Sequence, residues 1–328
     1  MPDPMFNMMS KSYLSLPVEE AEGFFFVADP HVADTPVGQR LSGYREQILE
    51  KIRACLGEAR ARNLCPVFLG DLFNWPRDNS NSLLIELMEL FRPYKPWVLV
   101  GNHDKYQARF TSDVSLSVLK AAGVINLMSD VGPQFVLHTS EGDVLLGASP
   151  DGTDIPKIYE REDGCPETVF WVSHHNVSFP DFPDKKCAIK EISGVDWLVN
   201  GHIHRPQPTL KKGMTTWTNP GNISRVAFSQ RSKERKPEAS FWKHGFTDLK
   251  KWEVPHLPFE EVFPDQDFPD SVEPTERSKF IDGLERLSWR KTQEGTGLKQ
   301  FLEENLEDKA PASELIWQLY NEVIDNDK

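Results

Sequence analysis

Five short apolar segments of this sequence each run directly into residues whose side chains bind metal ions. The residues that follow them are Asp29-Pro30-His31, Gly70-Asp71, Gly101-Asn102-His103-Asp104, His174-His175 and Gly201-His202-Ile203-His204. A single histidine after a strand is usually a structural residue. Six of the nine histidines fall in these segments, however, and so many buried imidazoles and carboxylates would be costly without a shared ion. The pattern therefore predicts a metal centre.

The donor types restrict the metal. Oxygen and imidazole nitrogen without any thiolate suit manganese, iron or zinc rather than a structural cysteine site. The number of predicted ligands implies two divalent ions, with manganese the first choice. A carboxylate can bridge two ions about 3.5 to 4 Å apart, and such a pair can polarise a phosphoryl oxygen and generate a hydroxide in line with a leaving group. Asp71 is the predicted bridge.

The apolar segments themselves predict the elements that position these residues. Short apolar runs at 23–28, 66–70 and 97–101 are typical of strands, and the apolar residues of 44–63 and 82–91 recur at helical spacing. Strands that alternate with helices predict a parallel sheet covered on both faces. In such sheets the ligand site lies beyond the carboxyl ends of the strands, so we expect the polar residues to converge on one crevice.

The middle of the chain is rich in predicted strands with little helix between them. These strands are expected at 135–138, 144–148, 169–173, 197–200 and 214–218. We therefore predict a second sheet that is more antiparallel than the first.

The composition changes after Trp252, where Pro255, Pro258, Pro264, Pro269 and Pro274 fall in one acidic stretch. We predict a catalytic domain at 1–252, followed at 253–328 by a proline-rich acidic strap and two amphipathic C-terminal helices. The apolar stripes of these helices are Leu298, Phe301, Leu302 and Leu306, and Leu315, Ile316, Leu319, Tyr320 and Val323.

Composition limits the cell compartment and the partners. No run approaches a membrane span and residues 1–10 lack the pattern of a signal peptide, so we expect a cytoplasmic protein with no membrane partner. The four cysteines form no C-x-x-C pair, so we expect reduced thiols. The net charge is −13, but residues 253–328 hold 19 Asp and Glu against 8 Lys and Arg. The body is thus nearly neutral, and a nucleic-acid partner is not excluded.

The ordered set D-P-H, G-D, G-N-H-D, H and G-H-I-H resembles the calcineurin-like metallophosphoesterase superfamily over residues 29–204. The resemblance implies an α/β fold in which a two-sheet β-sandwich is flanked by helices (α/β/β/α). It implies that Asp29, His31, Asp71 and His204 hold one metal ion, and that Asp71, Asn102, His174 and His202 hold the other. It also implies that His103 lies over the scissile phosphate, where an imidazole can stabilise the transition state or protonate the leaving oxygen.

Two residues of these motifs have alternative roles. The strand predicted to end at Ser173 delivers His174 to the site first, and in the superfamily the first histidine of such a pair is usually the ligand. His175 is then expected either behind the ligands or exposed. Asp104 is expected to pair with His103 or with a basic neighbour, or to be structural.

Three further motifs look like those of SbcD-type DNA repair exonucleases and their phage relatives, over residues 24–242. They are G-D-L-F-N-W at 70–75, G-H-I-H-R-P-Q at 201–207 and N-P-G-N-I-S-R at 219–225. Related nucleases commonly place His or Asp three residues after the bridging Asp, where it orients the catalytic histidine. Here that residue is Asn74, which can hydrogen-bond an imidazole but cannot carry a charge.

A basic stretch follows the last motif. Residues 225–236 contain Arg225, Arg231, Lys233, Arg235 and Lys236 against one acidic residue. These side chains are either a solvated loop or a surface that neutralises the phosphates of a DNA strand and positions it.

The leading hypothesis is a two-metal DNA exonuclease or endonuclease. The alternatives are a phosphatase or phosphodiesterase acting on small nucleotides or phosphoproteins, and a non-catalytic interaction module on the same fold. The chain lacks a G-x-x-x-x-G-K-[ST] phosphate loop, so ATP-driven work on DNA requires another protein. The resemblance implies an SbcC-like coiled-coil ATPase that binds the C-terminal tail. That tail could equally cover the protein's own sheet. Self-association as a homodimer is a further expectation.

Overall fold

The computed structural model describes residues 13–182, 187–266 and 317. The chain divides into two compact units, Met1–Phe268 and Pro269–Lys328. The two helices predicted near the C-terminus lie outside the described residues, apart from Trp317, which is helical. The predicted division of the chain at residue 252 stays a prediction.

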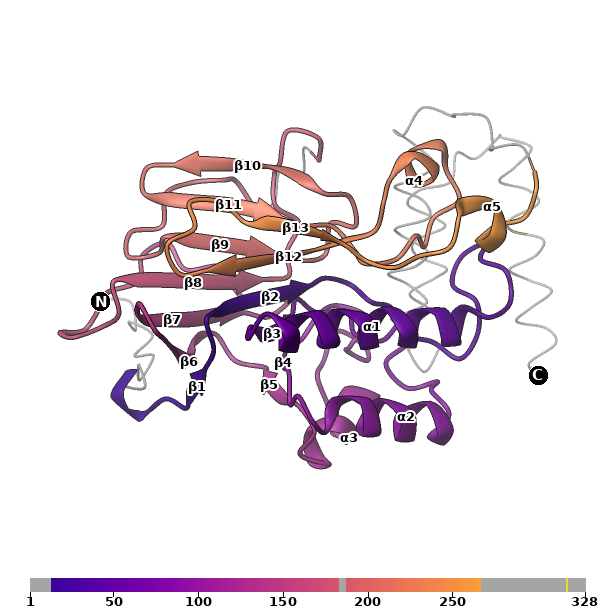
Figure 1. The fold of residues 1–328 in the computed structure, drawn as a ribbon, viewed down its shortest axis with the longest axis horizontal. Coiled ribbons are helices and arrows are strands. Elements are labelled where there is room, and N and C mark those ends of the chain that lie inside the picture. The colour runs from indigo at the N-terminus through magenta and orange to yellow at the C-terminus, as the bar shows by residue number, and fades with distance from the viewer. Residues whose placement is uncertain (1–12, 183–186, 267–316, 318–328) are drawn as a thin grey trace. The chain divides into compact units, whose positions relative to one another are not determined.

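One sheet of the first unit has six strands in the order β13-β12-β2-β3-β4-β5 (Figure 1). Its strands are β2 (Gly23–Val27), β3 (Cys65–Phe68), β4 (Trp97–Leu99), β5 (Asn126–Met128), β12 (Glu238–Lys243) and β13 (Lys250–Glu253). The four strands from β2 to β5 are parallel, as predicted from the alternation of strands and helices. The strands β12 and β13 add two antiparallel pairings at the edge of β2.

The second sheet has seven strands in the order β1-β6-β7-β8-β9-β11-β10. They are β1 (Val18–Glu20), β6 (Gly132–Thr139), β7 (Gly142–Ser149), β8 (Thr168–Ser173), β9 (Trp197–Asn200), β10 (Gln207–Lys212) and β11 (Thr215–Asn219). The prediction of a more antiparallel sheet is wrong, because four of the six pairings between these described strands are parallel. A helix is usual in crossovers of this kind, but the described residues between β7 and β8 and between β8 and β9 form none, so no helical period marks them in the sequence.

The helices lie on the outer face of the six-stranded sheet (Figure 1). They are α1 (Tyr44–Ala61), α2 (Asn81–Phe91) and α3 (Ser115–Ala121), while the short elements η1 (Tyr13–Ser15), α4 (Gln230–Glu234) and α5 (Phe259–Val262) lie elsewhere in the chain. The outer face of the seven-stranded sheet is covered by irregular segments that include Tyr159, Phe179 and Ile192. These layers confirm the predicted α/β class with two packed sheets. No helix in the described part of the chain is long and apolar enough to cross a membrane.

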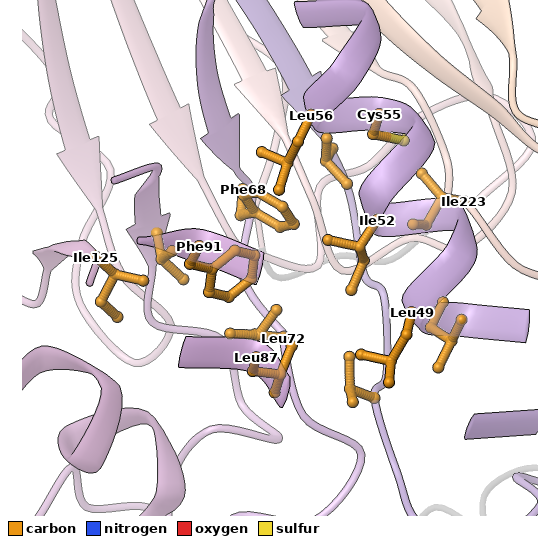
Figure 2. Packing of buried hydrophobic residues seen from close by; sticks show 14 of the residues in the cluster. Leu49, Ile52, Cys55, Leu56, Phe68, Leu72, Leu87, Phe91, Ile125 and Ile223 are labelled. Carbon is orange, nitrogen blue, oxygen red and sulfur yellow. The ribbon is translucent and has the colours of Figure 1, made fainter. Parts of the chain in front are cut away.

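Two apolar layers hold this arrangement together. Between the sheets, Phe24 and Phe26 of β2 pack against Phe170 of β8. On the helical side, Ile52 and Leu56 of α1 and several residues of α2 fill the space above the six-stranded sheet (Figure 2). Alternate residues of β2 therefore face opposite layers, as the pleat of a strand requires. The rigid strands fix where each carboxyl end lies.

We predict that Phe91→Ala lowers the free energy of unfolding by about 3–5 kcal/mol, because the ring is fully buried and packs edge-on against Phe68 at 5.5 Å between centroids. Urea unfolding followed by tryptophan fluorescence measures the loss. The matched control on the same helix is Ile85→Ala, whose side chain is 54% exposed and whose removal should cost less than about 0.5 kcal/mol. Equal losses from the two variants would contradict the assigned core.

Candidate metal centre

The carboxyl ends of five strands bring the seven predicted metal ligands to one edge of the two sheets. Asp29 and His31 follow β2, Asp71 follows β3 and Asn102 follows β4. The other sheet supplies His174 directly after β8, and His202 and His204 directly after β9. The site therefore lies where the carboxyl ends of both sheets meet, as expected for an α/β fold.

Asp29, His31, Asp71 and His204 form the first potential metal-binding group, with ligand atoms that all lie within 4.8 Å of one another. The Nε2 atoms of His31 and His204 are 2.8 Å apart and so face one point. Asp29, His31 and Asp71 are buried, and His204 is half-buried. This is the set that the family resemblance implied for one ion.

Asp71, His174 and His202 form the second group, again within 4.8 Å of one another. The side-chain oxygen of Asn102 lies 3.1 Å from His174 Nε2 and 2.8 Å from His202 Nδ1. An amide oxygen between two imidazole nitrogens completes a set of oxygen and nitrogen donors. The structure thus places Asn102 with the residues that the family resemblance implied for the second ion.

The carboxylate of Asp71 is common to both groups. Its Oδ2 lies 3.2 Å from His174 Nε2 and 3.9 Å from His31 Nε2, so one oxygen faces both groups. Its Oδ1 accepts a hydrogen bond from the backbone amide of His103 at 2.8 Å. That bond fixes the carboxylate's rotation, which is the geometry that a bridging ligand needs.

Hydrogen bonds from the rear select the ring nitrogen that each histidine presents. His174 Nδ1 donates to the carbonyl oxygen of Leu69 at 2.7 Å, which leaves Nε2 toward Asp71 and Asn102. His202 Nε2 lies 2.8 Å from the side-chain oxygen of Asn176, so the ring donates there and presents Nδ1. Sequence reasoning missed Asn176. Its only signal is an amide residue two positions after His174.

The backbone at this edge is strained. Four of the predicted ligands have positive φ angles: Asp29 (45°), His31 (52°), Asp71 (49°) and His202 (70°). A residue other than glycine held in this region costs on the order of 1–3 kcal/mol, and such residues cluster at functional sites. The strain fits a site whose geometry serves ligand binding rather than stability.

Glycine is required beside two of the ligands. A Cβ at Gly101 would collide with Oδ1 of Asp71, and one at Gly70, whose φ is +97°, would collide with the ring of His174. The G-D and G-N-H-D motifs therefore contain glycine so that the backbone at these positions can lie close to the side chains of Asp71 and His174.

Burial and charge set the protonation of the site. Burial raises the pKa of Asp29 to about 7, and His174 opposes that shift. Burial also acts to raise the pKa of Asp71, but the imidazoles of His174 and His103 outweigh it and hold that pKa well below its usual range. Burial lowers the pKa of His204 to about 3 and that of His202 to about 4. Burial also acts to lower the pKa of His174, but Asp71 and Asp29 outweigh it and raise that pKa to about 10. Metal ions are ligated by ionised carboxylates and neutral imidazoles, so an ion at the second group would displace a proton from His174.

The site fits divalent cations. Asp29 Oδ2 and His31 Nδ1 are buried and have no hydrogen-bond partner among the residues that the structure describes. A buried carboxylate oxygen left in this way is costly unless a cation compensates it. Together with a donor set of carboxylate, amide and imidazole, Asp29 Oδ2 supports metal binding at the first group.

His103 lies beside the first group, with its ring edge-on to that of His31 at 4.7 Å between centroids. Its Nδ1 lies 2.9 Å from the backbone carbonyl oxygen of Asn74 and donates a hydrogen bond to it. The sequence led us to expect the Asn74 side chain in this role, whereas the structure uses its main chain. Because Nδ1 is held by this carbonyl, any proton exchange by His103 would take place at Nε2.

The two residues with alternative roles are resolved by their contacts. Asp104 is buried and accepts hydrogen bonds from the backbone amides of Phe73 (3.2 Å) and Gly101 (2.9 Å), so it ties the segments after β3 and β4 together. His175 is half-buried and its Nε2 lies 2.6 Å from the carbonyl oxygen of Thr153. Neither residue belongs to the two potential metal-binding groups.

The basic stretch is not gathered into one surface. Arg225 and Arg235 donate to backbone carbonyl oxygens, including that of His204 at 2.8 Å from Arg235 Nη1. Lys233 pairs with Glu260 and Lys236 with Glu253, each at 2.8 Å. Arg231 is exposed on α4. A role for these residues in binding DNA stays a prediction.

The sequence of residues 24–206 matches the family model described as calcineurin-like phosphoesterase. The chain belongs to this family. The match covers β2 to the segment after β9 and so includes every predicted metal ligand. No curated protein matches the chain.

Two solved structures are similar at low sequence identity. One is a conserved uncharacterized protein of Streptococcus pneumoniae, described as a predicted phosphoesterase, with 13% identity over 74% of this chain and 94% of that one and a TM-score of 0.33. The other is a hypothetical protein of Thermus thermophilus, with 14% identity over 71% of this chain and 100% of that one and a TM-score of 0.39. With TM-scores below 0.5, neither likeness carries weight for fold or function.

We predict that Asp71→Asn lowers the bound metal from two ions to one or fewer per chain, because the shared carboxylate loses its charge. Mass spectrometry of the metal released from purified protein counts the ions. The matched control is His103→Ala, a neighbour outside both groups, which should retain two ions while turnover falls about 100-fold or more. Two ions bound to the Asp71→Asn protein would rule out the bridge, and loss of an ion from His103→Ala would make His103 a ligand.

Proposed function

We propose that this phosphoesterase hydrolyses phosphodiester bonds in DNA with two divalent metal ions, as an SbcD-type nuclease does. The observation that carries the hydrolytic part is the position of Asp71, one oxygen of which faces two groups of metal-binding side chains. Among the metals that suit such oxygen and imidazole donors, manganese is our first choice and iron and zinc are alternatives.

Bound ions would supply Lewis acidity toward the phosphoryl oxygens. The chain's own contribution is to place a proton donor beside them. The main-chain carbonyl of Asn74 holds His103 at Nδ1, so Nε2 is the atom that gives a proton to the leaving oxygen. Because that carbonyl belongs to the backbone, the orientation of His103 does not depend on the charge or acidity of residue 74.

DNA is favoured as the substrate by the three SbcD-like motifs and by one exposed aromatic residue. Trp75 follows Asn74 directly and is 45% exposed. An indole at that position offers a face on which an unpaired base can stack, a contact worth about 1–3 kcal/mol and tolerant of sequence. Arg231 is an exposed cation available to a phosphate.

Hydrolysis of a smaller phosphoester is the second candidate, and a specific observation favours it. Lys233 and Lys236 are already paired with Glu260 and Glu253, so they offer a nucleic-acid backbone less charge than the sequence suggests. A small ester would need only the metal centre and His103.

Two partners belong to the proposal. An SbcC-like coiled-coil ATPase would bind the C-terminal tail and supply the ATP-driven step, and a second copy of the chain would form a homodimer. The motifs at 70–75, 201–207 and 219–225 support the ATPase through the resemblance that they carry.

The substrate is decided by assaying the manganese-loaded protein on single-stranded DNA, on duplex ends and on bis-p-nitrophenyl phosphate. We predict cleavage of DNA, and a weaker, less salt-dependent affinity for DNA when Arg231, Lys233 and Lys236 are changed to Gln, because fewer phosphates are neutralised. Arg225 and Arg235 are left unchanged because their guanidinium groups hold the backbone.

Hydrolysis of the small ester should be the same in the triple variant and in the unaltered protein. The control is a second triple variant that removes the same charge from β10 and β12, with Lys211, Lys212 and Lys243 changed to Gln. If the ester is cleaved and DNA is not, the nuclease assignment fails and the phosphoesterase assignment stands. If neither is cleaved, the chain is a non-catalytic module.

A further inference from the structure

A pocket with a volume of about 410 Å³ lies outside the metal centre. Arg40, Lys51 of α1 and Arg225 line it, together with the apolar side chains of Pro255, Leu257 and Val262. None of its lining residues is a predicted metal ligand. The volume falls in the range of pockets that hold small organic molecules, about 300–1,000 Å³.

The three basic side chains of this pocket are buried. Lys51 Nζ donates to the carbonyl oxygen of Ile223 at 3.1 Å, and Arg40 donates to that of Arg225 at 2.9 Å and to Gln47. Arg225 donates to the carbonyl oxygen of Leu257 at 3.0 Å. Every one of these partners is a neutral oxygen, so none of these hydrogen bonds compensates a positive charge. Glu260 and Glu253 lie close enough to act on the pKa of Arg225, but each forms its ion pair with a lysine instead.

No carboxylate lies within ion-pair distance of these three groups among the residues that the structure describes. Glu46 and Glu50 also line the pocket, but both are exposed, and Glu50 pairs with Arg53 at 2.6 Å. Arg40 Nε is buried and has no hydrogen-bond partner among the described residues. An unpaired charge in a buried position costs several kcal/mol, so the cluster carries a deficit that an anion would remove.

The state of Lys51 agrees with that deficit. Burial, together with the neighbouring charges of Arg40 and Arg225, lowers the pKa of its amine to about 7. His256 also lines the pocket. Its pKa is lowered, chiefly by burial, and its side chain adds no negative charge. An anion beside Lys51 would reverse these effects and keep the amine protonated.

Lys51 and Arg40 also hold the backbone of residues 223–225, but that task does not explain their charge. Ile223 packs beside α1 in the apolar core, which already fixes this segment (Figure 2). A carbonyl oxygen can be satisfied by a neutral donor at lower cost than by a buried ammonium or guanidinium group. Arg40 Nε, moreover, has no such task.

We propose that this pocket binds a phosphomonoester with an apolar body. Two guanidinium groups and one ammonium group match the charge and the several acceptor oxygens of a phosphate better than those of a carboxylate. The phosphate would lie against Arg40, Lys51 and Arg225, and the apolar body against Pro255, Leu257 and Val262. The inference is independent of the substrate that the metal centre hydrolyses.

The test uses phenylphosphonate, which cannot be hydrolysed as an ester, and the full-length metal-loaded protein. Acetic anhydride acetylates neutral amines, and mass spectrometry of peptides gives the rate at each lysine, so binding at the metal centre does not enter the reading. We expect saturating phenylphosphonate to slow acetylation of Lys51 at least tenfold. Lys211, exposed on β10, is the internal control and should react at an unchanged rate.

Arg40→Gln should raise the phenylphosphonate concentration needed for protection at least tenfold. Arg92→Gln, which removes an exposed arginine at the end of α2, away from the pocket lining, should leave it unchanged. Benzoate should protect only at concentrations at least tenfold higher, and equal protection by benzoate would overturn the preference for phosphate. Should the Arg40 variant not fold, the measurement on the unaltered protein still decides, because failure of phenylphosphonate to protect Lys51 overturns the proposal.

Discussion

The burial of three carboxylates at the edge where two sheets meet is the constraint on which the site depends. Asp29, Asp71 and Asp104 are all removed from water, and each is stabilised differently. Asp104 accepts hydrogen bonds from two backbone amides, whereas Asp71 is surrounded by imidazoles that keep it ionised. Asp29 is the least compensated, with a pKa raised by burial to about 7 and one oxygen without a partner in the described part of the chain. A cation at the first group would compensate this oxygen of Asp29, which is why metal binding accounts for its burial.

The backbone is arranged to serve these carboxylates rather than to be relaxed. Positive φ angles at Asp29, His31, Asp71 and His202 turn the chain sharply after each strand and aim the side chains at one another. The apolar layers around β2 and α1 are what hold those turns in place. The packing of the core therefore offsets the backbone strain at the site, as is usual where a rigid scaffold supports a functional site.

Much of this could be predicted from the sequence, because local signals carry it. Each predicted ligand follows an apolar run, and the buried face of α1 recurs at helical spacing. Pairings between distant segments have no such signal, so the antiparallel contact of β12 with β2 and the parallel crossovers of the second sheet were not predicted. The contact of Asn176 with His202 and the hydrogen bond from His103 to the main chain of Asn74 also join distant segments, so they too were not predicted. In the sequence, Arg225 and Arg235 belong to a run of charges of the kind that is usually solvated. In the fold they donate hydrogen bonds to backbone carbonyl oxygens instead.

Anomalous scattering from crystals of the manganese-loaded protein tests the central claim most directly, because it locates each ion without reference to activity. The account predicts two manganese peaks, one at the group of Asp29, His31 and His204 and one at the group of Asn102, His174 and His202, with Asp71 in contact with both. A single peak, or two peaks of which only one contacts Asp71, would contradict the account.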